Sequence, residues 1–367
     1  MNYIYDEIVM LLQDIFINRK KELAEISSGI ALGQSFIIIA PRRYGKTTLI
    51  KKIAKDIESQ NQVIYIDVMR YAHSVISLAE AITEACLAKI GITGKLSNWL
   101  KNIDVKLDLK IKFQELEVDI ILEQIAANDG YNALAKSLEL AEKLALKYNQ
   151  RWVMIYDEIG ELQHLDEQAI RVMRSVIQHH QHVSYLFAGS QESLMNNIFI
   201  SNRGAFYRFG IIYQLAELEL KELVEFFHAS LSNVNSEVID FIIDNFHGHP
   251  YYTTNIFYRV IQRIMLDNLT SFGLSDLRNV IQDLLSSETH YLADQVIRLN
   301  QRKNTFAVLL AASLGDPYQT EGKLSKQSIH ATLKNLVQDG YLRNNAGKYK
   351  LTDPLLCLYL RDASLIV

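Results

Sequence analysis

A glycine, a lysine and a threonine stand in a row as Gly45, Lys46 and Thr47, after a short apolar run and before a stretch with helical periodicity. From Ala40 onward the segment fits the phosphate-loop pattern G-x-x-x-x-G-K-[ST] at every position but the first, where alanine replaces glycine. Backbone N–H groups of such a loop, together with the start of the following helix, attract an anion. Glycine lets the backbone approach that anion closely. The spacing therefore predicts that the phosphates of a nucleotide bind here.

Each residue type in the predicted loop has a chemical task. We expect the Lys46 ammonium to reach the β- and γ-phosphates, the Thr47 hydroxyl to bind Mg²⁺ and Thr48 to donate to the α-phosphate. A strand, turn and helix without a ligand is the alternative, but it would leave the lysine at the positive end of the helix dipole. The predicted nucleotide-binding residues of this loop are Pro41, Arg42, Arg43, Tyr44, Gly45, Lys46, Thr47 and Thr48.

Two adjacent acids, Asp157 and Glu158, follow another apolar run at 152–156. We expect Asp157 to hold Mg²⁺, directly or through water. Glu158 would polarise the attacking water as general base. Acids at a strand end also serve as helix N-caps, which is the alternative. Their place after a buried strand, downstream of a phosphate loop, favours the metal and base roles.

A serine and two arginines are further catalytic candidates. Ser190 follows the apolar run 185–188, where its hydroxyl would contact the γ-phosphate or the attacking water. Arg203 and Arg208 lie in the next loop, which we expect near the nucleotide. Either arginine would serve as an arginine finger, within the chain or from a neighbouring subunit. An ordinary surface arginine is the alternative for each.

A histidine-containing turn lies further along the chain. Gly248 and Pro250 bracket His249 and predict a rigid turn before a helix, which would contact the nucleotide. His247 and His249 alone are too few ligands to indicate a metal site.

The apolar runs indicate the fold that positions these residues. Short runs of three to six mostly apolar residues, separated by amphipathic segments, predict the buried parallel strands of an α/β P-loop core. The expected strands are 36–40, 63–68, 152–156, 185–188 and 211–213. Between the second and third of them, apolar and charged residues alternate at 103–118, which predicts an inserted β-hairpin over about 103–119.

The remainder of the chain predicts two more domains. After Leu215 the strand signals stop, and helical periodicity predicts a mostly helical domain at 215–300 after a core at 1–214. In 301–367, two helical patterns precede two short strands that turn at 344–347, which is the outline of a winged helix.

Composition restricts the class of protein. The net charge is −4, so binding to a polyanion would depend on a local basic patch. Two cysteines, Cys86 and Cys357, give no disulfide framework and fit a reducing cytoplasm. The amino terminus carries acids where a signal peptide needs basic residues. No apolar run approaches the roughly 18 residues that span a bilayer. We therefore expect a cytoplasmic protein without a membrane partner.

Six segments resemble the archaeal-type ATPase family, a branch of the STAND signalling ATPases that is related to AAA+ proteins. They occur in the order FINRKKELAEI, APRRYGKTTLI, MIYDEIGEL, LFAGSQESLM, HGHPYY and GKYKLTDPLLCLYLR, and extend from Phe16 to Arg361. The resemblance implies an ATP-binding α/β core, a helical lid and a winged helix. It also implies that ATP, rather than GTP, is the nucleotide.

The resemblance adds roles for individual residues. It implies that Phe16 and Arg19 lie beside the adenine or elsewhere in the nucleotide pocket. It implies the sensor role for Ser190 and a nucleotide contact from the lid for the turn that ends at Pro250. Two departures are Ala40, in place of the usual glycine, and the order around Arg208, because relatives often end that loop in Gly-Arg.

Three functions follow from these observations. The first is an ATPase that binds ATP with Mg²⁺, hydrolyses it slowly and acts as a nucleotide-dependent switch, alone or with a protein partner or further copies of itself. The second is a DNA-binding protein regulated by ATP, because Lys326, His330 and Lys334 recur at four-residue spacing on one helix. The third is a nucleotide-binding scaffold without turnover, which the presence of Glu158 disfavours.

Overall fold

The computed structural model of the chain describes residues 19–92, 121, 123–125, 127–190, 192–320, 324–345 and 347–361. The chain divides into two compact units, Met1–Ala216 and Glu217–Val367. The hairpin predicted at 103–119 and the nucleotide contact predicted for Phe16 lie outside the described residues.

A five-stranded sheet forms the centre of the first unit, and the predicted α/β class is confirmed. The strands are β1 (Phe36–Ile39), β2 (Gln62–Asp67), β3 (Trp152–Asp157), β4 (Val183–Gly189) and β5 (Ile211–Gln214). Their order is β2-β3-β4-β1-β5, and every neighbouring pair is parallel. All five strands therefore end at the same edge of the sheet.

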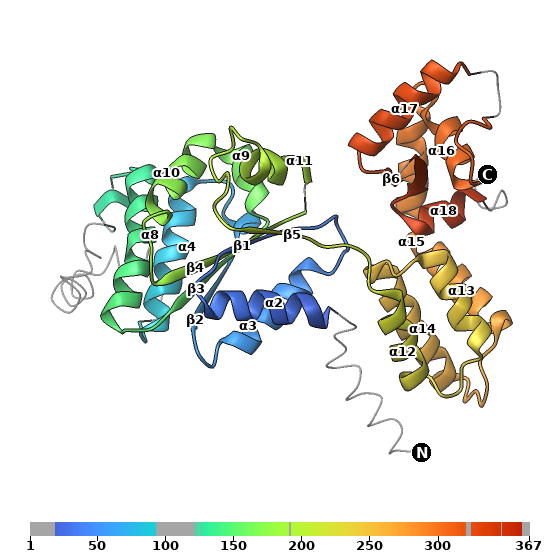
Figure 1. Cartoon of the computed structure of the whole chain (residues 1–367), viewed down its shortest axis with the longest axis horizontal. Helices are drawn as coiled ribbons and strands as arrows, with labels where there is room; N and C mark the ends of the chain where they lie inside the picture. Colours follow the sequence, from blue (N-terminus) through green and yellow to red (C-terminus); the bar gives the residue numbers. More distant parts are fainter. Residues whose placement is uncertain are drawn as a thin grey trace. The chain divides into compact units, whose positions relative to one another are not determined.

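Helices cover both faces of this sheet, which is why its strands read as continuous apolar runs. One face packs against α2 (Lys20–Ala31) and α3 (Lys46–Ile57), and the other against α4 (Val75–Lys89), α8 (Gly130–Lys147) and α10 (Glu167–Ile177) (Figure 1). Alternate residues of each strand enter the two cores, because successive side chains of a strand point to opposite faces.

Shorter elements connect the strands and helices of the first unit. They are η1 (Val68–Arg70), η3 (Ile159–Glu161), α9 (Leu162–Leu165), α11 (Glu192–Met195) and the π-helical segment η4 (Asn196–Ile200). Local capping fixes several helix starts. The Asp129 side chain accepts from the Asn132 backbone N–H before α8, and Asp166 accepts from the Gln168 N–H before α10.

The second unit is helical apart from one small hairpin. Its helices are α12 (Leu220–Ser230), α13 (Ser236–Phe246), α14 (Pro250–Leu266), α15 (Leu274–Asn300), α16 (Thr305–Ser313), α17 (Lys326–Gln338) and α18 (Pro354–Arg361). Strands β6 (Leu342–Asn345) and β7 (Lys348–Leu351) pair antiparallel. The predicted boundary at 300 and 301, between lid and winged helix, coincides with the end of α15 and stays a prediction.

Among the described residues, no helix combines the length and the apolar character that crossing a membrane requires.

Candidate functional site

The site forms where three adjacent strands end. The phosphate loop follows β1, the acidic pair closes β3, and Ser190 follows β4. Because β4 lies between β1 and β3 in the sheet, these three chain segments meet at one edge. Sites of open α/β sheets form at this carboxyl edge.

The backbone of the phosphate loop is shaped to bind an anion. Arg43 and Gly45 have left-handed conformations, with φ of 68° and 75°. Lys46 then begins α3. Alternation of left- and right-handed residues directs successive N–H groups into a concave nest. Ala40 is buried and does not have a positive φ, so its Cβ is tolerated where the pattern has glycine.

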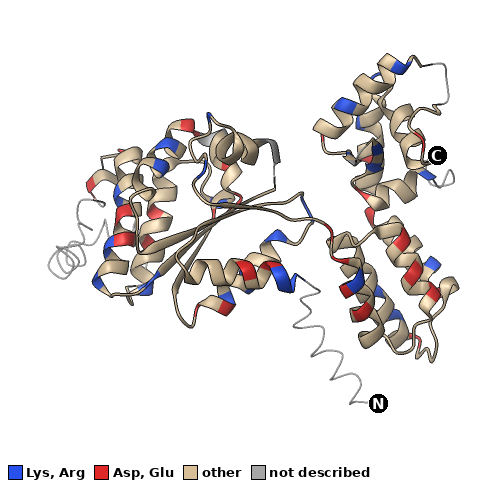
Figure 2. Cartoon of the chain, viewed as in Figure 1, with Lys and Arg blue, Asp and Glu red and all other residues tan. Residues whose placement is uncertain are grey.

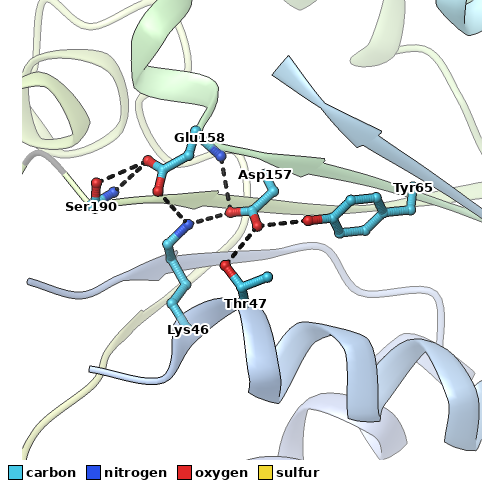
Figure 3. A network of polar contacts seen from close by, with 6 residues as sticks. All are labelled: Lys46, Thr47, Tyr65, Asp157, Glu158 and Ser190. Atoms are coloured by element: carbon cyan, nitrogen blue, oxygen red, sulfur yellow. Dashed lines mark hydrogen bonds and ion pairs between the residues drawn. The ribbon is translucent and has the colours of Figure 1, made fainter. Parts of the chain in front are cut away.

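Lys46 lies between the two acids (Figure 3). Its side chain is 5% exposed, and its ammonium forms ion pairs with Asp157 Oδ1 and, at 3.0 Å, with Glu158 Oε1. A buried ammonium requires compensating charge, and here two carboxylates supply it. The predicted lysine and the predicted acidic pair therefore form one charge cluster.

Asp157 is surrounded by donors on both carboxylate oxygens. Oδ1 accepts from Lys46 and, at 3.0 Å, from the backbone N–H of Glu158. Oδ2 accepts from the Thr47 hydroxyl at 3.0 Å and from the Tyr65 hydroxyl at 2.8 Å. Burial is the largest single influence and would raise the pKa of Asp157. The charge of Lys46 and the hydrogen bonds together outweigh it and hold the pKa below its usual value.

Glu158 turns out of the strand with φ of 54°, a left-handed conformation that is uncommon for a residue with a side chain. Its Oε2 accepts hydrogen bonds from the backbone N–H and from the hydroxyl of Ser190, both at 3.0 Å. The predicted base and the predicted sensor are thus in direct contact (Figure 3). With Lys46 on Oε1, the carboxylate orientation of Glu158 is fixed by three donors.

Tyr65 is the member of the site that sequence reasoning missed. It lies on β2, where it pairs with Ile155 of β3, so its side chain shares a face of the sheet with Asp157 two residues further on. The only sequence signal is a hydroxyl-bearing residue within an otherwise apolar strand. The contact depends on the register of two strands that are about 90 residues apart in sequence.

Arg19 contacts the backbone of the phosphate loop at Tyr44. The residue is 4% exposed, and its Nη2 donates to the carbonyl of Tyr44 at 3.1 Å and to the carbonyl of Ala216 at 2.8 Å. Nη1 pairs with Glu22 at 3.1 Å. The guanidinium therefore joins the loop that precedes Gly45 to the last residue of the first unit. The nucleotide contact predicted for Arg19 remains a prediction.

The other predicted loop residues differ in exposure. Arg42, Arg43 and Thr48 are exposed, and Pro41 is partly exposed. Tyr44 is 1% exposed and packs into the core between the sheet and helices α2 and α3. The ring of Tyr44 thus anchors the loop in this core.

Two further predicted residues are Arg208, which does not converge on this cluster, and Pro250, which belongs to the second unit. Arg208 lies three residues before β5, and the first residue of β5 pairs with Phe36, the first residue of β1. Arg208 therefore lies toward the amino edge of the sheet, whereas Lys46 follows the carboxyl edge. Pro250 begins α14 in the second unit. The roles predicted for both residues stay predictions.

The donor set is suited to magnesium held jointly with phosphate. Among the described residues, no group of three or more His, Cys, Asp and Glu side chains forms a closed metal site. Thr47 and Asp157 offer one hydroxyl and one carboxylate within 3.0 Å of each other. Mg²⁺ typically takes one or two carboxylates and completes its shell with phosphate oxygens and water. The residues present therefore fit a magnesium–nucleotide complex.

Comparison with known proteins agrees with this geometry. The parallel sheet with a phosphate loop after β1 and an acidic pair after β3 defines a P-loop nucleoside triphosphatase. The chain belongs to a family of ATPase domains found predominantly in Archaea, whose model matches residues 16–256. The family expected from the sequence is confirmed, while its assignment to the STAND class stays a prediction. A comparison with curated proteins gives no match.

Solved structures show the same fold at low sequence identity. A Walker-type ATPase of Pyrococcus abyssi is 14% identical with a TM-score of 0.63, over 94% of this chain and 96% of that one. The ORC2 protein of Aeropyrum pernix, solved with ADPNP and ADP, is 12% identical with a TM-score of 0.58, over 95% of this chain and 93% of that one. These structures show the fold, and the family match of residues 16–256 supports an ATP-binding ATPase at the level of the family.

Proposed function

We propose that this chain binds ATP with Mg²⁺ and hydrolyses it slowly, and that the bound nucleotide switches the state of the protein. One observation carries the proposal: Lys46, Thr47, Asp157, Glu158 and Ser190 join in a single hydrogen-bonded network beside a loop shaped for phosphate. Each of the five is a residue type that phosphoryl transfer requires.

The network suggests how its members divide the work. Lys46 would pair with the β- and γ-phosphates, while Thr47 and Asp157 would hold Mg²⁺. Bound Mg²⁺ supplies charge neutralisation to the phosphate oxygens. Glu158 would orient the attacking water and accept its proton, because it is the less buried of the two acids. Ser190 would then keep the Glu158 carboxylate oriented toward the attacking water. The Ser190 hydroxyl would also reach this water.

Competition for Lys46 supports a switch. The ammonium contacts both carboxylates, so a triphosphate that takes this ammonium must draw it away from them. Exchange of one buried ion pair for another changes the backbone around Glu158 and the phosphate loop together, as in other γ-phosphate switches. The predicted lid and winged helix would change their arrangement in response to that backbone change.

An arginine from another copy or a partner protein would accelerate turnover. Arg208 lies three residues before β5, toward the amino edge of the sheet and away from the phosphate loop of its own chain. We therefore assign Arg208 to the neighbouring-subunit form of the arginine finger, which contributes about 10³-fold or more to the rate where it operates. Arg203 stays a candidate for either form.

Phosphate release by the wild type, Lys46→Ala and Glu158→Gln tests the proposal. Glu158→Gln should bind ATP as tightly as the wild type and hydrolyse it at least about 100-fold more slowly. Lys46→Ala should lose both properties. Glu167→Gln removes an exposed surface carboxylate that pairs with Arg171 and serves as the matched control. If the wild type and Glu158→Gln release phosphate equally, the proposed role of the glutamate is wrong.

DNA binding by the second unit is a second candidate, and one observation favours it. Lys326, His330 and Lys334 are exposed on one face of α17, and Lys348 and Lys350 are exposed on β7. In Figure 2 the lysine positions along α17 are blue. A helix followed by a two-stranded wing, here α17 with β6 and β7, is the arrangement that DNA-binding winged helices use. Fluorescence anisotropy with labelled duplex DNA at several salt concentrations tests this, because phosphate contacts give a steep salt slope.

A further inference from the structure

Tyr65 provides a hydrogen bond that the proposed reaction does not otherwise use. Its hydroxyl donates to Asp157 Oδ2 at 2.8 Å from the neighbouring strand (Figure 3). The residue is 37% exposed, so burial of the ring does not by itself explain the position of the hydroxyl. On the open face of a strand, a tyrosine is free to direct its hydroxyl to solvent, and here it is directed at the acid.

The donors to Asp157 fall into two classes. Lys46 and Thr47 come from the phosphate loop and α3, and both have other partners in the proposed function, namely phosphate and Mg²⁺. Tyr65 and the backbone N–H of Glu158 come from the sheet and its edge. Each of these two holds a different carboxylate oxygen. Together they define the plane of the carboxylate without help from the loop.

We propose that Tyr65 is a positioning residue that keeps the Asp157 carboxylate oriented for Mg²⁺ when Lys46 and Thr47 turn to the nucleotide. The inference rests on the proposed function, because it requires Asp157 to be the magnesium-side acid. A partner of this kind orients the carboxylate and sets metal affinity, and its loss typically costs about 10- to 100-fold.

The register between β2 and β3 explains why the side chain at position 65 reaches the Asp157 carboxylate. Tyr65 pairs with Ile155, and Asp67 pairs with Asp157 at the end of β2 and β3. A residue two positions before the pairing partner of Asp157 lies diagonally across from it on the same face of the sheet, within reach of a long aromatic side chain. Ile64 and Ile66 enter the opposite core and have no access to the carboxylate.

The test is Tyr65→Phe, which removes one oxygen atom and keeps the ring. We would titrate Mg²⁺ into protein with a fluorescent ADP analogue and record binding, so that the readout is independent of turnover. The half-saturating Mg²⁺ concentration should rise about tenfold, while affinity for the same nucleotide in EDTA should not change. Tyr148→Phe is the matched control, since Tyr148 is an exposed tyrosine at the end of α8. Coincident Mg²⁺ titrations for Tyr65→Phe and the wild type would overturn the inference.

A double variant separates orientation of Asp157 from a general effect on the fold. In an Asp157→Asn background, the addition of Tyr65→Phe should leave the Mg²⁺ titration unchanged, because the oriented carboxylate is already lost. A further tenfold change in that background would overturn the positioning role. If the wild type itself binds the nucleotide with no dependence on Mg²⁺, the proposed function fails first. A Mg²⁺-dependent wild type with an unaffected Tyr65→Phe refutes only the role of Tyr65.

Discussion

Two groups of charged residues in this molecule are built in opposite ways. In the first unit, Lys46 and Asp157 are each 5% exposed at the side chain and neutralise one another. In the second unit, Lys326, His330 and Lys334 line the exposed face of α17. A buried charge is too costly to leave without partners, whereas an exposed charge is stable in water alone. The contacts of Lys46 and Asp157 therefore indicate what chemistry the buried group can do. For the exposed group on α17, only the pattern of charges suggests a ligand.

The same difference predicts different responses to salt. Buried pairs are screened little by ions, while exposed charges more than about 10 Å apart lose most of their interaction at 0.1 M salt. Nucleotide binding at the phosphate loop should therefore weaken only slightly as salt increases. Any DNA binding by the second unit should weaken steeply, because it releases counterions from the duplex.

The largest effect is expected from removal of the buried cation. Lys46→Ala leaves two carboxylates facing each other in a buried site, and breaking a buried ion pair on one side costs about 3–5 kcal/mol in the free energy of unfolding. Urea denaturation at pH 7 measures this. Lys52→Ala lies on the same helix and removes an exposed pair with Asp56 at 3.0 Å, so it should cost less than about 1 kcal/mol. Equal losses in the two variants would contradict the distinction between buried and exposed charges.

A second test removes the buried cation Arg19, whose guanidinium donates to two backbone carbonyls. Arg19→Ala leaves the carbonyls of Tyr44 and Ala216 without the donor they now share. The bond to Tyr44 is buried, whereas the one to Ala216 is only part-buried. Since an unsatisfied buried acceptor costs about 1–3 kcal/mol, we expect a loss of about 2 kcal/mol. Hydrogen exchange should become faster at 44–46 and near 216. Arg42→Ala, at an exposed position of the same loop, is the control. Unchanged exchange at both segments would show that Arg19 does not join them.

Sequence reasoning predicted which side chains meet at the candidate site wherever the signal was local. Lys46, Asp157 and Ser190 each follow an apolar strand, and in a parallel sheet the strand ends meet at one edge regardless of the strand order. The strands themselves were predictable for the same reason, because burial on both faces produces continuous apolar runs.

The contacts that escaped prediction depend on the three-dimensional arrangement of distant segments. Tyr65 reaches Asp157 only because of the register between β2 and β3. Arg19 meets Ala216 across almost 200 residues of sequence. Arg208 was expected near the nucleotide, but the pairing of β5 with β1 places it toward the amino edge. No periodicity or motif in the sequence encodes the register between two strands or the sheet edge at which a loop lies. These contacts could therefore be found only in the structure.

Exposed cations of the second unit give a smaller expected effect. Lys326→Gln combined with Lys334→Gln should weaken binding of duplex DNA by about 1–2 kcal/mol and reduce the salt slope by about 2, if each lysine contacts one phosphate. Anisotropy titrations from low to high salt measure both quantities. Lys221→Gln changes an exposed lysine on α12 and should leave the slope unchanged. Equal slopes for the double variant and the wild type would exclude this face of α17 as the DNA site.

The smallest expected effect comes from Glu142, a half-buried charge intermediate between the two groups. Its carboxylate accepts from the backbone N–H of Gln181 at 2.9 Å and of His182 at 3.1 Å, and it meets the His182 ring at 2.8 Å. Burial is the largest influence and raises the pKa of Glu142, but the hydrogen bonds from Gln181 and His182 outweigh it, so the net pKa is lowered.

This lowered pKa determines the sign of a pH effect. A carboxylate with a folded-state pKa below its unfolded value stabilises the protein above the unfolded pKa, and that stabilisation is lost as pH falls through the folded pKa. Glu142→Gln should therefore cost about 1 kcal/mol at pH 7, and the difference from the wild type should shrink as pH falls below about 4. Glu139→Gln, which removes a partly exposed pair with Lys136, should cost less at every pH. A difference between Glu142→Gln and the wild type that stays constant down to pH 3 would show that shape, and not charge, holds the turn before β4.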